Sequence, residues 1–237
     1  MPDPKKPPET EDGELFFSSR YTRKQAENYF HKHHESLSRR LSNWREQQNA
    51  RKALQIAGNP KSVLDLPCGT GRFWELLAED PHRELLAADY SEDMLEVAKE
   101  YRPPGLVARF RIFQASAFDI DLPDEAVDNI FCMRLLHHIG ESEDRLRIFR
   151  EFHRVTRDTV CLSLWVDGNY MGWKRRRLEE ARASGKVPYK RRYLDRFVRS
   201  RRELEQEFDD CGFDIIGKVD FLPGWSMWRT YVLRKRR

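Results

Sequence analysis

The residues best suited to chemistry are two acids and two glycines, placed where apolar runs end. Asp65 lies in the first run, at residues 62–66, and Gly69 and Gly71 follow it in a turn. Glycines lack Cβ atoms, so a ligand can approach their backbone and the turn can use positive φ. Asp89 ends the next apolar run, where a carboxylate can accept both hydroxyls of a ribose. This spacing predicts a nucleotide-like ligand at the open end of a parallel-sheet unit.

Four short motifs in order resemble those of one enzyme family. Residues 65–71, Asp-Leu-Pro-Cys-Gly-Thr-Gly, resemble motif I of the class I S-adenosylmethionine-dependent methyltransferases, and residues 88–91 resemble their second motif. The stretches at residues 121–124 and 128–138 resemble the third and fourth. The resemblance implies an enzyme that uses S-adenosylmethionine and releases S-adenosylhomocysteine.

One departure from the family concerns Pro67, which replaces the first glycine of the usual motif. Proline has no amide N–H, so a ligand contact through that group is excluded. The resemblance implies that Asp65 and the glycine turn hold the methionine end, that Asp89 takes the ribose, and that Tyr90 lies beside the adenine. Met94 fits either an adenine contact or a core position. The expected cofactor-binding residues are Asp65, Pro67, Cys68, Gly69, Gly71, Asp89, Tyr90, Met94, Ser116, Ala117 and Met133.

Two adjacent histidines, His137 and His138, follow the expected fourth strand. A histidine there could take a proton from a substrate hydroxyl or amine near neutral pH. Because a methyl sulfonium is already activated, alignment and exclusion of water remain the main catalytic tasks. Leu-His-His is also a common structural feature of the family. Both histidines are therefore candidate catalytic residues, with a structural role as the alternative.

Residues 168–202 form a strongly basic segment, with thirteen Lys and Arg against three acids and five interleaved aromatic residues. The segment follows the expected fifth strand, where the resembled family builds acceptor specificity. Its charge and aromatic content suit binding to a small or lipid-linked anionic acceptor, to an anionic membrane surface or to RNA. The alternative is a solvated basic surface that binds nothing. We expect salt-sensitive acceptor binding. The candidate substrate-binding residues are Arg134, Tyr170, Trp173 and Lys174.

Three other functions remain open. A nucleic-acid methyltransferase is less favoured, because no Asn-Pro-Pro-Tyr-type motif follows the fourth strand. An NAD-dependent oxidoreductase shares the glycines and the ribose acid, but Pro67 and the later motifs count against it. A non-catalytic scaffold that binds S-adenosylmethionine is the third alternative.

Strand-like runs alternate with helical periods, which predicts an α/β fold with a doubly wound parallel sheet. The resemblance implies a Rossmann-like sheet of seven strands, closed by a C-terminal antiparallel hairpin. We expect a disordered leader at residues 1–19, a helical arm at 20–58 and a methyltransferase domain at 59–237, with the basic insert inside it. The expected strands are residues 62–66, 84–89, 109–115, 128–133, 160–165, 213–221 and 227–234.

The arm is predicted to be helical over residues 22–57, because apolar residues recur at steps of three and four. It serves either as a lid on the cofactor or as a packing arm. The cluster His31, His33 and His34 is interpreted as part of the helix rather than as a metal site, since no further ligand pattern accompanies it. The expected apolar stripe is Ala26, Phe30, His33, Leu37, Leu41 and Trp44.

Composition sets the remaining expectations. The chain has 237 residues, 35% of them charged, and a net charge of +4, which suits a real core under a charged surface. Four cysteines show no CxxC pair, so we expect buried free thiols in a reducing compartment. No run approaches the ~18 apolar residues of a membrane span. The sequence therefore predicts a soluble cytoplasmic protein with no metal.

Overall fold

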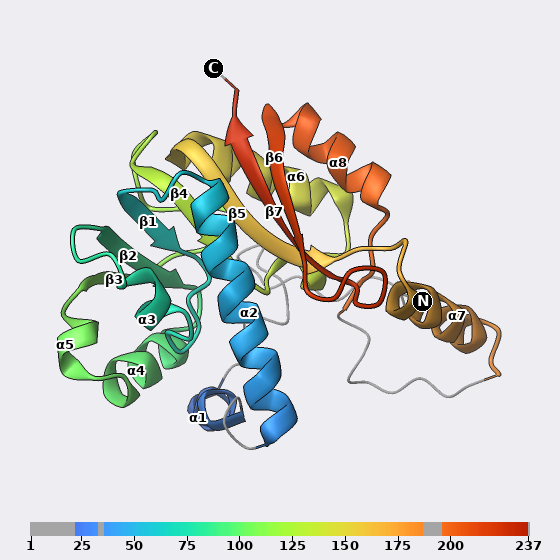
Figure 1. Cartoon of the computed structure of the whole chain (residues 1–237), viewed down its shortest axis with the longest axis horizontal. Coiled ribbons are helices and arrows are strands. Elements are labelled where there is room, and N and C mark those ends of the chain that lie inside the picture. Colours follow the sequence, from blue (N-terminus) through green and yellow to red (C-terminus); the bar gives the residue numbers. More distant parts are fainter. Residues whose placement is uncertain (1–21, 33–35, 187–195, 237) are drawn as a thin grey trace, which may run out of the picture.

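A single mixed sheet organises the residues that the computed structural model describes, which are 22–32, 36–186 and 196–236 (Figure 1). Within them, seven strands follow the order β3-β2-β1-β4-β5-β7-β6. The first five strands pair in parallel, and β7 is antiparallel to both β5 and β6. The predicted doubly wound fold with its terminal hairpin is confirmed. The strands are β1 Ser62–Asp65, β2 Glu84–Asp89, β3 Phe110–Gln114, β4 Val127–Cys132, β5 Thr156–Trp165, β6 Phe213–Asp220 and β7 Trp228–Lys235.

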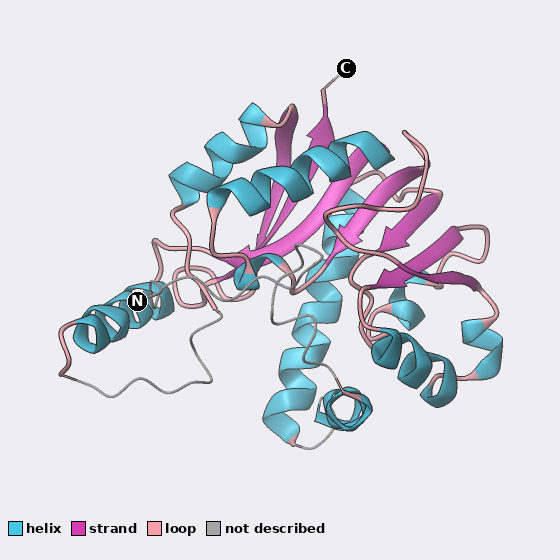
Figure 2. Cartoon of the chain, turned by 180° about the vertical axis from the view of Figure 1, so that it is seen from behind, coloured by secondary structure: helices cyan, strands magenta, loops and turns pink. Residues whose placement is uncertain are grey.

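Helices cover both faces of the sheet. The helix α2 crosses one face in Figure 1, and α6 and α8 lie together on the other face in Figure 2. Two helix starts follow the predicted caps, since the Ser91 and Ser200 hydroxyls accept from the Met94 and Glu203 amides. The helices are α1 Arg23–Lys32, α2 Leu37–Ile56, α3 Trp74–Leu77, α4 Glu92–Tyr101, α5 Pro104–Val107, the short 3-10 helix η2 Leu136–His138, α6 Ser142–Val155, α7 Tyr170–Ala183 and α8 Arg201–Asp210.

The core has two layers because neighbouring side chains of a strand point to opposite faces. In β1, Leu64 joins the layer that contains Phe149 of α6 and Phe208 of α8. Val63 joins the other layer, with Ala53 of α2. All five of these side chains are buried to 0% exposure, which fixes the strand register against both helix layers.

The N-terminal arm differs from its prediction. The expected helix over residues 22–57 is divided into α1 and α2, so the expected apolar stripe falls on two helices. Its second half does not pack on the fold, because Leu37, Leu41 and Trp44 are 81%, 65% and 55% exposed. The buried part of α2 is Asn49, Ala50, Ala53 and Leu54. The amino-terminal half of α2 projects beyond the sheet (Figure 1), so its apolar stripe has no strand to pack on. The predicted leader and two of the clustered histidines, His33 and His34, lie outside the described residues.

A buried ion pair links α6 to α8 beneath the two adjacent histidines. The Arg145 guanidinium donates to the Glu207 carboxylate at 2.8 and 2.5 Å, and the Arg145 and Glu207 side chains are 3% and 9% exposed. Arg145 also donates to the backbone carbonyls of Ile139 and Gly140 at 3.3 and 2.9 Å. The pair therefore holds the segment that directly follows η2.

We expect Glu207→Ala to lower the free energy of unfolding by about 3–5 kcal/mol, because it leaves the Arg145 charge buried without its partner. Chemical denaturation followed by circular dichroism measures this loss. The matched control is Asp210→Ala at the exposed end of the same helix, where a change below about 0.5 kcal/mol is expected. Equal effects of the two substitutions would contradict the assigned role of the pair.

Candidate functional site

A cavity of about 300 Å³ lies at the carboxyl ends of β1, β2 and β4. This volume is within the range of small-molecule sites, and this edge of a parallel sheet is where such ligands bind. The lining residues come from α1, from the turn after each of the three strands, from the first turn of α4, from the segment after β3 and from the segment before α8. They are Tyr29, Leu66, Pro67, Cys68, Gly69, Arg72, Phe73, Asp89, Tyr90, Met94, Ala115, Ala117, Phe118, Met133, Arg134, Leu135, His137, His138 and Arg196.

Asp89 connects the turns that follow the first two strands. Its carboxylate accepts from the Gly69 amide at 2.8 Å and from the Ser91 amide at 2.9 Å, through different oxygens. Gly69 has φ +54, a conformation that glycine adopts without strain. Burial raises the Asp89 pKa to about 6, and the two amide bonds oppose this shift. Each oxygen keeps a second acceptor position, so the group can also take two hydroxyl donors.

Asp65 lies behind the cavity wall rather than in it. Its side chain is 1% exposed, and neither carboxylate oxygen has a hydrogen-bond partner among the described residues. Burial, together with the nearby Asp89 charge, raises the Asp65 pKa well above its ordinary value. A buried carboxyl without a partner is costly, and a donor arriving from a ligand or a water would relieve that cost. Because Asp65 does not line the cavity, it supports the turn from behind, and a water would have to carry any interaction with a ligand.

The other predicted cofactor residues divide into lining and supporting positions. Pro67, Cys68, Tyr90, Met94, Ala117 and Met133 line the cavity, whereas Gly71 and Ser116 do not. The Ser116 hydroxyl accepts from the Phe118 amide at 3.0 Å and so shapes the turn after β3. Burial raises the Cys68 pKa well above its ordinary value, so its thiol stays protonated. All four cysteines are buried and free, as predicted.

The part of the cavity lining that follows β4 is basic. Arg134, His137 and His138 belong to it, and Arg196 adds a further cation from the segment before α8. Arg134 follows the last residues of β4 at φ +67, and its amide donates to the Ser163 hydroxyl at 3.0 Å. A non-glycine residue in this conformation is uncommon and often marks a functional segment. Asp89 ends β2, and Arg134 and the two histidines follow β4, with β1 between the two strands in the sheet, so the cavity has an acidic end at β2 and a basic end at β4.

His137 is a buried, uncharged imidazole in this part of the lining. It is 3% exposed, and its Nδ1 atom has no hydrogen-bond partner among the described residues. Its ring lies 4.0 Å from the His138 ring, 5.0 Å from Trp165 and 4.8 Å from Trp228, measured between centroids. Burial, followed by the His138, Arg134 and Arg196 charges, holds the His137 pKa well below its ordinary value. The neutral ring can accept a proton.

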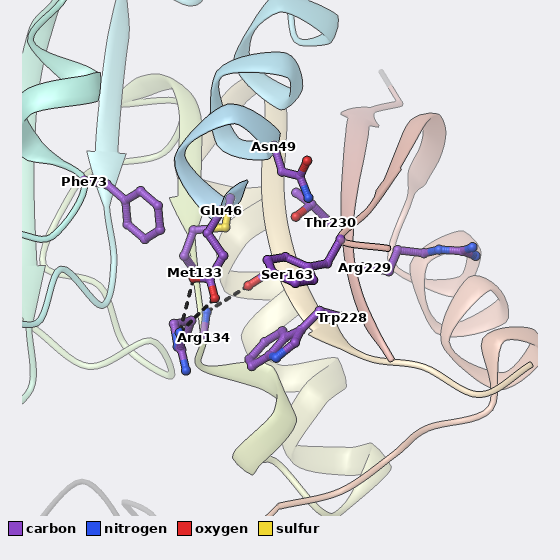
Figure 3. Close-up of a pocket in the computed structure, with 10 residues that line it drawn as sticks. Glu46, Asn49, Phe73, Met133, Arg134, Ser163, Trp228, Arg229 and Thr230 are labelled. Atoms are coloured by element: carbon purple, nitrogen blue, oxygen red, sulfur yellow. Dashed lines mark hydrogen bonds and ion pairs between the residues drawn. The ribbon is translucent and has the colours of Figure 1, made fainter. Parts of the chain in front are cut away.

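Glu46 of α2 bridges two arginines that line the cavity. Its carboxylate lies 2.7 Å from Arg72 Nη1 and 3.1 Å from Arg134 Nη1. The Arg134 guanidinium also lies over the Trp228 ring, 5.0 Å from its centroid. Figure 3 shows these residues around a smaller pocket of about 30 Å³, which shares Phe73, Met133 and Arg134 with the cavity. The arm thus connects to the turns after β1 and β4.

Sequence reasoning missed several lining residues. Arg72 and Phe73 directly follow the glycine motif, so their position next to Gly71 was an available signal. Tyr29 and Arg196 are far from every motif, and only the tertiary structure brings them to the cavity. Conversely, the predicted substrate residues Tyr170, Trp173 and Lys174 lie on α7 and do not line the cavity. Of the predicted substrate residues, Arg134 alone does so.

Comparison with protein families gives a match inside the chain. Residues 63–159 match the family model described as a methyltransferase domain. The chain is 30% identical over 129 residues to a demethylmenaquinone methyltransferase of Geobacillus kaustophilus, which covers 52% of this chain and 53% of the relative. It is 26% identical over 136 residues to the protein of that name from Listeria welshimeri, covering 55% of each. The chain thus spans about half the length of these curated relatives.

Solved structures extend the likeness to nearly the whole chain. The magnesium protoporphyrin IX methyltransferase of Synechocystis, solved with bound SAH, has a TM-score of 0.71 at 14% identity, over 92% of this chain and 98% of that one. A putative sarcosine dimethylglycine methyltransferase of Galdieria sulphuraria has a TM-score of 0.62 at 15% identity, over 81% and 86%. At these identities the likeness establishes the Rossmann-like methyltransferase fold.

We expect Gly71→Ala to lower the free energy of unfolding by about 2 kcal/mol or more, which chemical denaturation measures. Gly71 has φ +70, and an added Cβ would lie 2.7 Å from the Trp74 ring. Two controls separate the causes. Gly58→Ala keeps the positive φ (+85) with nothing within 4 Å, so a loss of about 1 kcal/mol is expected. Gly105→Ala meets neither obstacle, and a loss there as large as at Gly71 would refute the explanation.

Proposed function

We propose that this chain transfers a methyl group from S-adenosylmethionine to a small or lipid-linked anionic acceptor. The observation that carries the proposal is the cavity itself, which is lined at once by the Asp89 carboxylate and the Gly69 turn and by arginine and histidine side chains. The matched methyltransferase domain covers the motifs that form both ends. The SAH-bound relative with the same fold supports the choice of cofactor.

The acidic end binds the adenosyl part. Asp89 accepts the ribose hydroxyls, and its two amide bonds hold the carboxylate in position. The apolar side chains of Met94, Ala117 and Phe118, with Tyr90, form the surface for a flat base. The Gly69 turn lets the ligand approach the backbone. Asp65, buried without a partner behind the turn, supports the amine end.

The basic end binds the acceptor. Arg134 and Arg196 supply two guanidinium groups that hydrogen-bond well to phosphate or carboxylate. Arg134 is oriented by Glu46 and by the Trp228 ring, so its guanidinium has a defined place before an acceptor arrives. Met133 lines the space between the two ends. When bound, S-adenosylmethionine supplies an activated methyl sulfonium there.

His137 takes the proton that the acceptor loses. Burial depresses its pKa most, and the charges of His138, Arg134 and Arg196 add to this effect; an anionic acceptor beside these groups offsets the part that comes from their charges. Binding of the acceptor therefore strengthens the base at the moment when it is needed. The Trp165 and Trp228 rings around the imidazole exclude water from this side.

The acceptor class follows from the site more than from the relatives. The relatives' names refer to two different compounds, demethylmenaquinone and magnesium protoporphyrin IX, and the chain spans only about half of the curated relatives. The lining combines guanidinium groups with Phe73, Leu135 and Met133. This combination suits an acceptor with an anionic group next to an apolar body.

We expect S-adenosylhomocysteine to bind the purified protein and Asp89→Ala to weaken its affinity roughly 100-fold, as two charge-assisted hydrogen bonds are lost. Isothermal titration calorimetry measures the affinity, and parallel titration with NAD tests the oxidoreductase alternative. The control is Glu92→Gln. Glu92 is an exposed acid in the first turn of α4, three residues after Asp89, and its replacement should leave the affinity unchanged. Binding of NAD in place of S-adenosylhomocysteine would overturn the proposal.

The same titration has a pH dependence with a defined sign. Folding raises the Asp89 pKa from 3.8 to about 6. Between pH 3.8 and about pH 6 the folded chain therefore binds a proton that the unfolded chain has lost, and the contribution of this group to stability decreases as the pH rises through that range. Ribose donors need the ionised form. The dissociation constant of S-adenosylhomocysteine should therefore increase about tenfold from about pH 7 to about pH 5, and Asp89→Asn should remove that dependence.

We expect His137→Gln to lower the turnover number roughly 100-fold with a smaller change in KM, because a general base acts mainly in the transition state. The assay is mass spectrometry of cell extract for products one methyl group heavier, formed with S-adenosylmethionine. His138→Gln is the neighbouring control, with a smaller expected loss. If His137→Gln retains full turnover while S-adenosylhomocysteine affinity is unchanged, the histidine has only a structural role.

A further inference from the structure

An exposed aromatic cluster lies outside the cavity, where α7 meets the loop between β6 and β7. We define it as Tyr170, Trp173, Leu222 and Trp225, which are 43%, 51%, 46% and 55% exposed. The Tyr170 and Trp225 rings are stacked, with centroids 4.6 Å apart and planes at 25°. The Tyr170 and Trp173 rings are 6.0 Å apart. Exposed large apolar groups gathered at one place mark an interaction surface.

Basic side chains share this surface. Positions 170, 173, 174 and 177 lie on one face of α7, because helical neighbours are three and four residues apart. Lys174, Arg176 and Arg177 are exposed, and the Arg177 guanidinium lies 4.5 Å from the centroid of the Trp173 ring. The face therefore presents aromatic rings and cations together.

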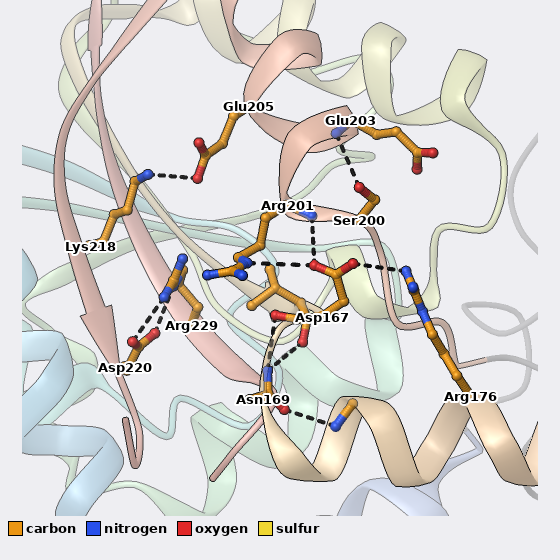
Figure 4. Close-up of polar contacts among 12 residues, drawn as sticks. Asp167, Asn169, Arg176, Ser200, Arg201, Glu203, Glu205, Lys218, Asp220 and Arg229 are labelled. Carbon is orange, nitrogen blue, oxygen red and sulfur yellow. Dashed lines mark hydrogen bonds and ion pairs between the residues drawn. The ribbon is translucent and has the colours of Figure 1, made fainter. Parts of the chain in front are cut away.

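The cluster is held rigidly. The Asn169 carboxamide caps α7 through the Gly172 amide at 2.8 Å and donates to the Val166 carbonyl at 2.7 Å (Figure 4). Asp167 binds both Arg176 and the Arg201 amide at 3.0 Å, which joins α7 to the start of α8 (Figure 4). The first two amides of α7 donate to the Gly224 and Trp225 carbonyls at 3.0 Å. These contacts fix the backbone that carries the exposed rings, so the rings have defined positions before a partner binds.

A second exposed apolar patch projects from the same edge of the sheet. Leu37, Leu41 and Trp44 form one stripe on the amino-terminal half of α2. Figure 1 shows this half of α2 and the helix α7 both extending beyond the carboxyl ends of the strands. Arg45 of α2 donates to the Phe221 carbonyl at 3.1 Å, so α2 contacts the loop that carries Leu222 and Trp225. The two apolar patches therefore lie at the edge of the sheet that also carries the cavity.

We propose that this edge docks on an anionic lipid surface, with the aromatic cluster in the interfacial layer and the cations of α7 against the headgroups. Tryptophan and tyrosine favour the membrane–water interface, and each nearby Lys or Arg adds attraction to anionic lipids. None of the helices in the described part of the chain is long and apolar enough to cross a bilayer. The contact is therefore a surface contact.

The composition of the surface favours a bilayer over RNA. Base stacking uses ring faces, and one face of Tyr170, Trp225 and Trp173 is already covered, by Trp225, Tyr170 and Arg177 respectively. The aliphatic Leu222, Leu37 and Leu41 gain nothing from base stacking and do gain from insertion into lipid. This last step rests on the proposed function: if that function holds, the acceptor enters the cavity from the lipid surface and carries an anionic headgroup.

The test is sedimentation of the full chain with vesicles of phosphatidylcholine, with and without phosphatidylglycerol, at low and high salt and without cofactor. We expect binding only with phosphatidylglycerol, weakened by salt. The double variant Trp173→Ala and Trp225→Ala should weaken it by at least about tenfold, and Lys174→Ala with Arg177→Ala by about fivefold for each charge. Lys61→Ala, which removes an exposed cation at the opposite edge of the sheet, should leave it unchanged.

Several outcomes would overturn the docking surface. These are no binding to phosphatidylglycerol vesicles, equal loss in Lys61→Ala and in the cluster variants, or retention of vesicle binding in variants that lose binding to a random single-stranded RNA. Circular dichroism and S-adenosylhomocysteine affinity verify that the variants are folded, since the cluster lies outside the cavity. Vesicle binding by a chain that does not bind S-adenosylhomocysteine would uphold the surface and refute the proposed function.

Discussion

The hydrogen bonds accepted by the Asp89 carboxylate are the constraint on which the cavity depends. They join the turn after β1 to the turn after β2 at 2.8 and 2.9 Å. Keeping a carboxyl group buried is unfavourable unless donors compensate it, and here the compensation comes from the same backbone that shapes the ligand site. The pKa of about 6 shows that the compensation is incomplete. A ligand with hydroxyl donors completes it, which connects the stability of these turns with binding.

A second network controls the other end of the cavity. Glu46 reaches from α2 to Arg72 and Arg134, so one carboxylate connects the arm with the turns after β1 and β4. The Glu46 side chain is 20% exposed and the Arg72 side chain 6%, so this interaction is screened less by solvent than a surface ion pair. Because α2 also packs on the sheet through Ala50, Ala53 and Leu54, the arm has one buried half that orients Glu46 and one exposed half. The arm packs on the sheet through α2, whereas its residue in the cavity lining is Tyr29 of α1.

The carboxyl edge of the sheet collects the groups that could act together. Parallel strands end at this edge, and the antiparallel β7 begins there, as the pairing of Trp165 with Trp228 shows. The cavity, the small pocket and the aromatic cluster are therefore neighbours although their residues are dispersed along the chain. The proposed methyl transfer in the cavity and the proposed lipid contact of the aromatic cluster therefore lie at the same edge of the sheet.

The sequence by itself determined the strand–turn–helix order, the glycine turn, the position of Asp89 and the helix caps at Ser91 and Ser200, because each depends on residues close in the chain. Only the tertiary structure decided that Tyr29 and Arg196 reach the cavity, that Asp65 lies behind its wall, and that Tyr170 and Trp173 point away from it. The arm shows the physical reason. Its periodicity correctly grouped Leu37, Leu41 and Trp44 on one face, but a periodic pattern identifies a face and not its partner, and burial depends on which distant element lies opposite.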